Sequence, residues 1–67
     1  RAESIIAGIK SPADAINYAI NFEKDSILLF FELSNLVAGA TRDVVMKLVD
    51  EEKDHLRRLS ELKRILK

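Results

Sequence analysis

The fold is decided by residues 11–41, SPADAINYAINFEKDSILLFFELSNLVAGAT. Ser11 can cap a helix, Pro12 suits the first helical position, and Asp14 completes a weak capping box. After this start the sequence continues for more than twenty residues without another Gly or Pro. That run predicts one uninterrupted helix over about residues 12–38.

A second helix is predicted after a short connection. Gly39 fits the left-handed backbone position that commonly ends a helix, and Thr41 can cap the helix that follows, over about residues 42–66. Because short connections make neighbouring helices antiparallel, the sequence predicts an all-α fold built on one antiparallel helical hairpin. Residues 1–10 are predicted to form a short lead of one or two helical turns, broken at Gly8.

Length and composition limit what one copy of the chain can do. With 67 residues, 48% of them hydrophobic, it forms at most one small domain and buries only about 60% of its unfolded surface. The absence of Cys excludes disulfides, thiolate zinc sites and iron–sulfur clusters, which leaves a metal or oligomerisation as the stabilising device.

Eleven basic and eleven acidic residues balance, so neither nucleic acid nor a membrane surface is an expected partner. The sequence contains no signal peptide and no apolar run that spans a bilayer, and we expect a cytoplasmic location.

Each predicted helix has an apolar stripe at about 100° per residue, and ionisable residues interrupt both stripes. The first stripe contains Ile16, Ala19, Ile20, Glu23, Ile27, Phe30 and Phe31, and the second contains Val44, Val45, Leu48, Val49, Glu52, His55, Leu56, Leu59, Leu62 and Leu66. The first helix has a further apolar side with Ala15, Tyr18, Phe22, Leu29, Leu33 and Leu36. A helix that is apolar over most of its circumference needs more than one neighbour, so we expect the hairpin to associate.

The interrupting residues Glu23, Glu52 and His55 predict a metal site. Ionisable groups on a core-facing stripe are costly unless something compensates them, and a metal ion can. At 1.5 Å rise per residue, Glu23, His55 and Glu52 lie about 22, 21 and 16 Å from the connection, within about one turn of each other. Carboxylate and imidazole ligands suit Fe(II), with Mn(II) or Zn(II) possible. We expect no catalytic residue beyond these metal ligands.

One hairpin leaves a metal ion under-coordinated, whereas two hairpins together supply four Glu and two His. That set is the one found in carboxylate di-iron four-helix bundles, where one helix of each pair contributes Glu and the other Glu-x-x-His. The sequence therefore predicts a homodimer of hairpins that forms a four-helix bundle. The alternative is a non-catalytic helical oligomerisation module, in which Glu52 and His55 form a buried polar network that specifies pairing.

The charges on the outer side of the second helix have a simpler interpretation. Lys53, Asp54, Arg57 and Arg58 are expected to form a solvated face. Asp54 and Arg58 are spaced for an i,i+4 ion pair, which stabilises a helix by a few tenths of a kcal/mol.

Two segments, AINYAINFEKDSILLFFE at residues 15–32 and VDEEKDHLRRL at residues 49–59, resemble the second half of a rubrerythrin-type, ferritin-like domain. The shared order is a helix with Glu, a short link, and a helix with Glu-x-x-His. The resemblance implies that residues 1–67 are a single ferritin-like half-domain and that Glu23, Glu52 and His55 are iron ligands. It also implies an iron-binding oxidoreductase whose di-iron site oxidises Fe(II) with a small oxidant, peroxide or dioxygen.

The chain departs from that family in three ways. It has one hairpin where the family domain usually has two, and without Cys it has no rubredoxin-like module. Ser26 stands where some rubrerythrins carry an additional carboxylate. Encapsulated ferritins, by resemblance, complete the site by pairing two one-hairpin chains. Because the chain begins with Arg1 rather than Met, a first hairpin upstream is the other expected source of the missing ligands.

Overall fold

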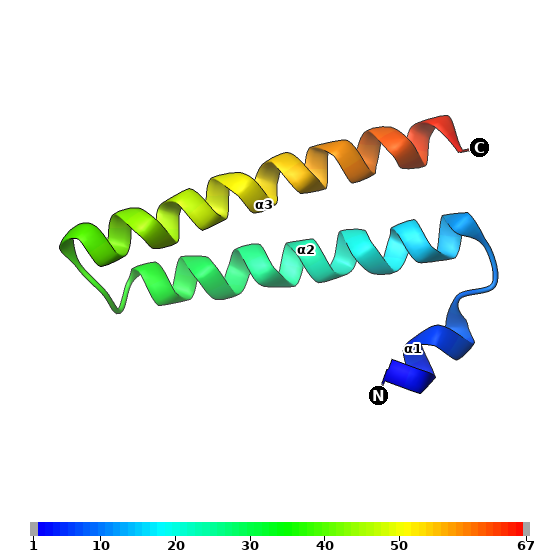
Figure 1. The fold of residues 1–67 in the computed structure, drawn as a ribbon, viewed down its shortest axis with the longest axis horizontal. Helices are drawn as coiled ribbons and strands as arrows, with labels where there is room; N and C mark the ends of the chain where they lie inside the picture. The colour runs from blue at the N-terminus through cyan, green and yellow to red at the C-terminus, as the bar shows by residue number, and fades with distance from the viewer. Residues whose placement is uncertain (1, 67) are drawn as a thin grey trace.

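A computed structural model describes residues 2–66 of the chain, and this part forms three helices (Figure 1). The helices are α1 (Ala2–Gly8), α2 (Pro12–Ser34) and α3 (Gly39–Ile65). The two long helices, α2 and α3, lie side by side and antiparallel, while α1 extends from the beginning of α2 on the side away from α3 (Figure 1). The predicted all-α fold and helical hairpin are confirmed. Arg1, on which the expectation of an upstream hairpin rested, lies outside the described residues.

The start of α2 has the predicted cap with one difference in its hydrogen bonds. The Ser11 hydroxyl accepts a hydrogen bond from the Asp14 backbone N–H at 3.1 Å, and Pro12 occupies the first helical position. The Asp14 carboxylate accepts from the backbone N–H of Lys10 at 3.0 Å, one residue before the cap. The return bond of the predicted capping box is therefore made to the residue before Ser11 and not to Ser11 itself.

The end of α2 lies at Ser34, four residues before the predicted end at Ala38. The Ser34 hydroxyl donates to the Phe31 carbonyl at 2.7 Å, so its side chain competes for backbone groups of the last turn. The backbone N–H groups of Asn35 and Leu36 bond to carbonyls three residues earlier, which tightens the chain beyond α-helical geometry. The prediction was wrong because the absence of Gly and Pro does not by itself continue a helix through Ser and Asn.

The start of α3 also differs from the prediction. Gly39 has φ 59°, the left-handed conformation expected of it, but it begins α3 instead of ending α2. Ala38, in an extended conformation, is the N-cap, and its side chain makes no capping hydrogen bond to the described residues. Thr41 lies inside the first turn, so its predicted role as the cap was wrong. Because α2 ends early, residues 35–38 reverse the chain and Gly39 provides the turn into α3.

The packing between α2 and α3 is a narrow apolar seam formed by the centres of the two predicted stripes. Its buried hydrophobic side chains within the described residues are Ile16, Ile20, Val45 and Val49. Val49 is completely buried. Other stripe residues are partly exposed or exposed, among them Val44 at 59%. The seam fixes which side of each helix faces the other.

One side of the hairpin presents an apolar surface, here called the open face. Its residues lie about a quarter turn or more from the seam, on the same side of the hairpin in both helices. They are Phe22, Leu29 and Leu33 on α2 and Val44, Leu48 and Leu62 on α3, and all are exposed. The opposite side is mainly polar, and there Lys53 Nζ lies 5.3 Å from the centre of the Phe31 ring.

The hairpin is a single layer of helices. With α1 included, the Cα atoms extend over 43 × 28 × 11 Å, and the shortest dimension is about the diameter of one helix. Stable domains usually pack two layers around a core, so the open face lacks a covering layer from residues 2–66. No helix among these residues is long and apolar enough to cross a membrane.

Replacing Val49 by Ala tests the importance of the seam. Val49→Ala removes two buried carbon atoms from the completely buried position and should lower the free energy of unfolding by about 2 kcal/mol. Leu28, which is 62% exposed and lies away from the open face, provides the control. Leu28→Ala should change stability by less than about 0.5 kcal/mol. Urea unfolding at equal chain concentration measures both variants, and equal losses would contradict the seam described here.

Candidate metal centre

Glu23 lies in the middle of α2, on the side that packs against α3. Ile20 and Ile27, one turn away on either side, share this orientation. Glu23 is half-buried, and its Oε2 is a buried oxygen with no hydrogen-bond partner among the described residues. A buried polar atom without a partner is destabilising, more so when the group is charged. Glu23 therefore needs a cation or a hydrogen-bond donor that residues 2–66 do not supply.

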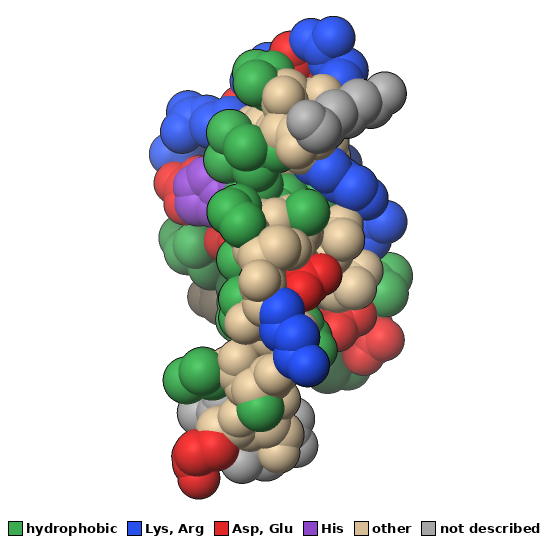
Figure 2. Space-filling view, turned by 90° about the vertical axis from the view of Figure 1, so that its right-hand side faces the viewer, with side chains coloured by type: hydrophobic (Ala, Val, Ile, Leu, Met, Phe, Trp, Pro, Cys, Tyr) green, Lys and Arg blue, Asp and Glu red, His purple; other side chains and the backbone are tan. Residues whose placement is uncertain are grey.

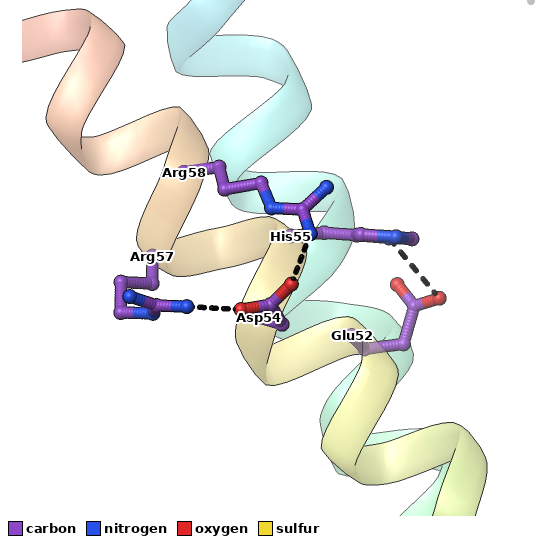
Figure 3. Close-up of polar contacts among 5 residues, drawn as sticks. All are labelled: Glu52, Asp54, His55, Arg57 and Arg58. Carbon is purple, nitrogen blue, oxygen red and sulfur yellow. Dashed lines mark hydrogen bonds and ion pairs between the residues drawn. The ribbon is translucent and has the colours of Figure 1, made fainter.

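Glu52 and His55 lie one turn apart on α3 and project to the same side of the helix (Figure 3). His55 Nδ1 lies 3.9 Å from Glu52 Oε1, too far for a hydrogen bond but close enough for an ion pair when the imidazole is protonated. The Glu52 side chain is 20% exposed and the His55 side chain 51%. Glu52 thus faces the seam, while His55 reaches the surface.

The three side chains converge between the helices. One ligand atom from each lies within 4.8 Å of those of the other two. Two atoms that each bind one ion at about 2.1 Å are at most about 4.2 Å apart, so small side-chain rotations are enough to close the group on one ion. Two carboxylates, one of which has a buried oxygen without a partner, and one imidazole fit a divalent cation in chemistry and charge.

The group opens onto the open face of the hairpin. Glu23 and His55 line a shallow cleft together with Ala19, Arg58 and Leu59. In Figure 2, which looks at the end of the hairpin where both termini lie, the imidazole of His55 is at the surface on the left, next to hydrophobic side chains. A molecule that covers the open face would therefore also cover this cleft.

Asp54 and two arginines form a charged cluster next to the cleft (Figure 3). Arg58 Nη2 lies 2.7 Å from Asp54 Oδ2, and Arg57 donates a hydrogen bond to the other oxygen, Oδ1. The hydrogen bond from Arg57, assisted by the charge of Arg58, holds the pKa of the Asp54 carboxyl below its usual value. The predicted Asp54–Arg58 ion pair is confirmed.

The structure brings together all three residues that the sequence selected. Their convergence follows from matched heights on facing stripes, but metal binding by Glu23, Glu52 and His55 stays a prediction. Arg58 is exposed, as predicted for the solvated face, but sequence reasoning missed that it also lies at the rim of the cleft. The spacing between His55 and Arg58 could have predicted this position, because a residue three positions after His55 lies one turn away on a neighbouring part of the helix surface.

No protein-family model, curated protein or solved structure matches this chain. The rubrerythrin-type resemblance of the two long segments therefore stays a prediction.

Replacing Glu23 by Leu tests whether its carboxylate is uncompensated without metal. Glu23→Leu exchanges a half-buried carboxyl group, one oxygen of which is buried without a partner, for an apolar group in an apolar stripe. In the presence of a chelator it should raise the free energy of unfolding by about 1–2 kcal/mol. Glu32→Leu, on the exposed side of α2, should change it by less than about 0.5 kcal/mol. Urea unfolding provides the measurement, and destabilisation by Glu23→Leu would show that the carboxylate already has a partner.

Proposed function

We propose that this chain is an iron-binding half-site of rubrerythrin or ferritin type, which pairs with a second copy to form a four-helix bundle around a di-iron centre. The observation that carries the proposal is the convergence of Glu23, Glu52 and His55, one of which, Glu23, has a buried carboxylate oxygen that lacks a partner within the described residues. The proposed activity is oxidation of Fe(II) by peroxide or dioxygen.

Charge and ligand number support two copies at one centre. A single group supplies only three ligand residues, and its imidazole is on the open side. Two groups supply two imidazoles and four carboxylates. The total charge of −4 on the four carboxylates balances two divalent ions. Without metal, the same four carboxylates repel one another and oppose pairing. Metal binding and dimerisation should therefore be coupled.

The shape of the hairpin supports a second copy as the partner. The chain exposes 5326 Å², whereas a compact monomer of 7.6 kDa exposes about 4,300 Å². The difference is close to the roughly 800 Å² that each partner buries in a standard interface. Glu23 also lies midway along α2, and Glu52 lies midway along α3. Two hairpins paired at the metal level would thus overlap along nearly their full length.

In this proposal the side chains have distinct tasks. Glu23 and Glu52 supply the negative charge that holds the metal, and His55 supplies a neutral nitrogen ligand. Iron, when bound, would supply the electron-transfer chemistry, with Fe(II) oxidised to Fe(III) and peroxide or dioxygen reduced. Ala19 and Leu59 beside the ligands, together with the partner's open face, would exclude bulk water from the centre.

Anaerobic addition of Fe(II) tests metal binding. At a free concentration one hundred times the dissociation constant, Fe(II) should stabilise the protein by about 2.7 kcal/mol, which raises the melting temperature. Glu23→Gln and Glu52→Gln each remove a ligand charge and should weaken binding by at least about tenfold.

Matched controls come from acidic residues on the outer sides of the same helices, Glu32→Gln on α2 and Asp50→Asn on α3. Both should bind Fe(II) as the unmodified chain does. Admission of oxygen or peroxide should then produce near-ultraviolet ferric absorption. Only trace metal in the protein, with a melting temperature that Fe(II) leaves unchanged, would contradict the proposal.

Sedimentation with and without Fe(II) tests the pairing. Val44→Asp puts a charge on the open face about two turns of α3 before Glu52. It should weaken dimerisation by at least about tenfold, because it buries an unpaired carboxylate in the interface. Leu28→Asp is the control, since Leu28 has similar exposure and lies on another side of the hairpin. A folded monomer with Fe(II) bound, or equal effects of both variants, would contradict pairing through the open face.

A non-catalytic oligomerisation module is the second candidate function. The 3.9 Å contact between Glu52 and His55 favours it, since such a pair can specify how two apolar faces align. This function requires a dimer whose stability does not depend on metal. Stable dimerisation in chelator, with no metal uptake, would support the module and exclude the iron centre.

A further inference from the structure

Arg58 introduces a positive charge at the rim of a cleft proposed to bind a cation. It lines the same cleft as Glu23 and His55. Its guanidinium is always protonated and lies on a long, flexible side chain that is 72% exposed. A free arginine in this position is a natural partner for a nearby carboxylate.

Glu23 is the carboxylate that lacks a partner. Its Oε2 is buried without a hydrogen bond from the described residues, although Arg58 lines the same cleft. A guanidinium and a metal ion would compensate the same charge, so they are alternatives at this oxygen. An Arg58–Glu23 pair would have to be broken before metal could bind, which would weaken metal binding.

In the structure Arg58 is paired with Asp54 instead. Its carboxylate holds Arg58 through Oδ2 at 2.7 Å and Arg57 through Oδ1, and the side chain is only 33% exposed (Figure 3). Both oxygens are therefore occupied by arginines from the following turn of α3. Arg57, by contrast, is not among the residues that line the cleft of Glu23 and His55.

We infer that Asp54 is a positioning residue for the metal centre: by holding Arg58 at its own carboxylate, it leaves Glu23 free to bind a metal ion. The inference rests on the proposed metal binding by Glu23, Glu52 and His55, and it adds a residue outside the ligand set. It assigns different roles to two adjacent arginines that contact the same aspartate.

A double-mutant cycle tests the inference, with Zn(II) as a redox-inactive probe and calorimetric titration as the readout. Asp54→Asn should weaken Zn(II) binding by about tenfold, in the range typical for residues that support metal ligands. Arg58→Gln alone should bind Zn(II) at least as tightly as the unmodified chain. The double variant Asp54→Asn/Arg58→Gln should recover most of the lost affinity, because no guanidinium remains to occupy Glu23.

Arg57 provides the matched control. Asp54→Asn/Arg57→Gln should keep the full defect, since Arg58 is still present and released. If Asp54→Asn weakens binding equally in the presence and absence of Arg58, the aspartate acts only through its overall charge and the inference is wrong. Equal rescue by the two arginine substitutions would overturn it as well.

The same titration separates the two levels of the proposal. Failure of the unmodified chain to bind Zn(II) or Fe(II) would refute the metal centre itself. Normal binding by the unmodified chain, together with normal binding by Asp54→Asn, would refute only the role of Asp54. Melting temperatures in chelator show that each variant is folded.

Discussion

The apolar seam between α2 and α3 is the interaction on which the other features of this hairpin depend. Ile16 and Ile20 on α2 and Val45 and Val49 on α3 are buried toward opposite ends of the interface between the two helices, and this burial sets the rotation of each helix about its own axis. Once the rotation is set, Glu23 and Glu52 must face the neighbouring helix. The convergence of the metal-ligand group is therefore a consequence of hydrophobic packing elsewhere along the seam.

Polar groups in such a seam reduce stability unless they are compensated. The buried Oε2 of Glu23 has no partner within residues 2–66, and the hairpin is too thin to enclose it on all sides. An apolar residue at that position would pack better. The proposed binding of a cation by Glu23, Glu52 and His55 would compensate this carboxylate.

The open face and the ligand group are both incomplete in a single hairpin. The face leaves large apolar side chains such as Phe22 and Leu29 exposed, and the group leaves a metal ion with too few ligands. A second hairpin would address both at once, since His55 opens onto that side. The charged cluster of Asp54, Arg57 and Arg58 then lies next to the proposed centre, and in our inference its internal pairing keeps Arg58 away from Glu23.

The sequence by itself determined the two long helices, their antiparallel order, the cap at Ser11 and the common height of Glu23, Glu52 and His55. These features depend on local propensity, helical periodicity and a constant rise per residue, which can be read along the chain. The tertiary structure decided where α2 ends, that Gly39 begins α3, that Glu23 Oε2 is buried without a partner, and that Arg58 reaches the cleft. These features depend on how closely a second helix approaches and which side chains it covers, and neither follows from spacing within one helix.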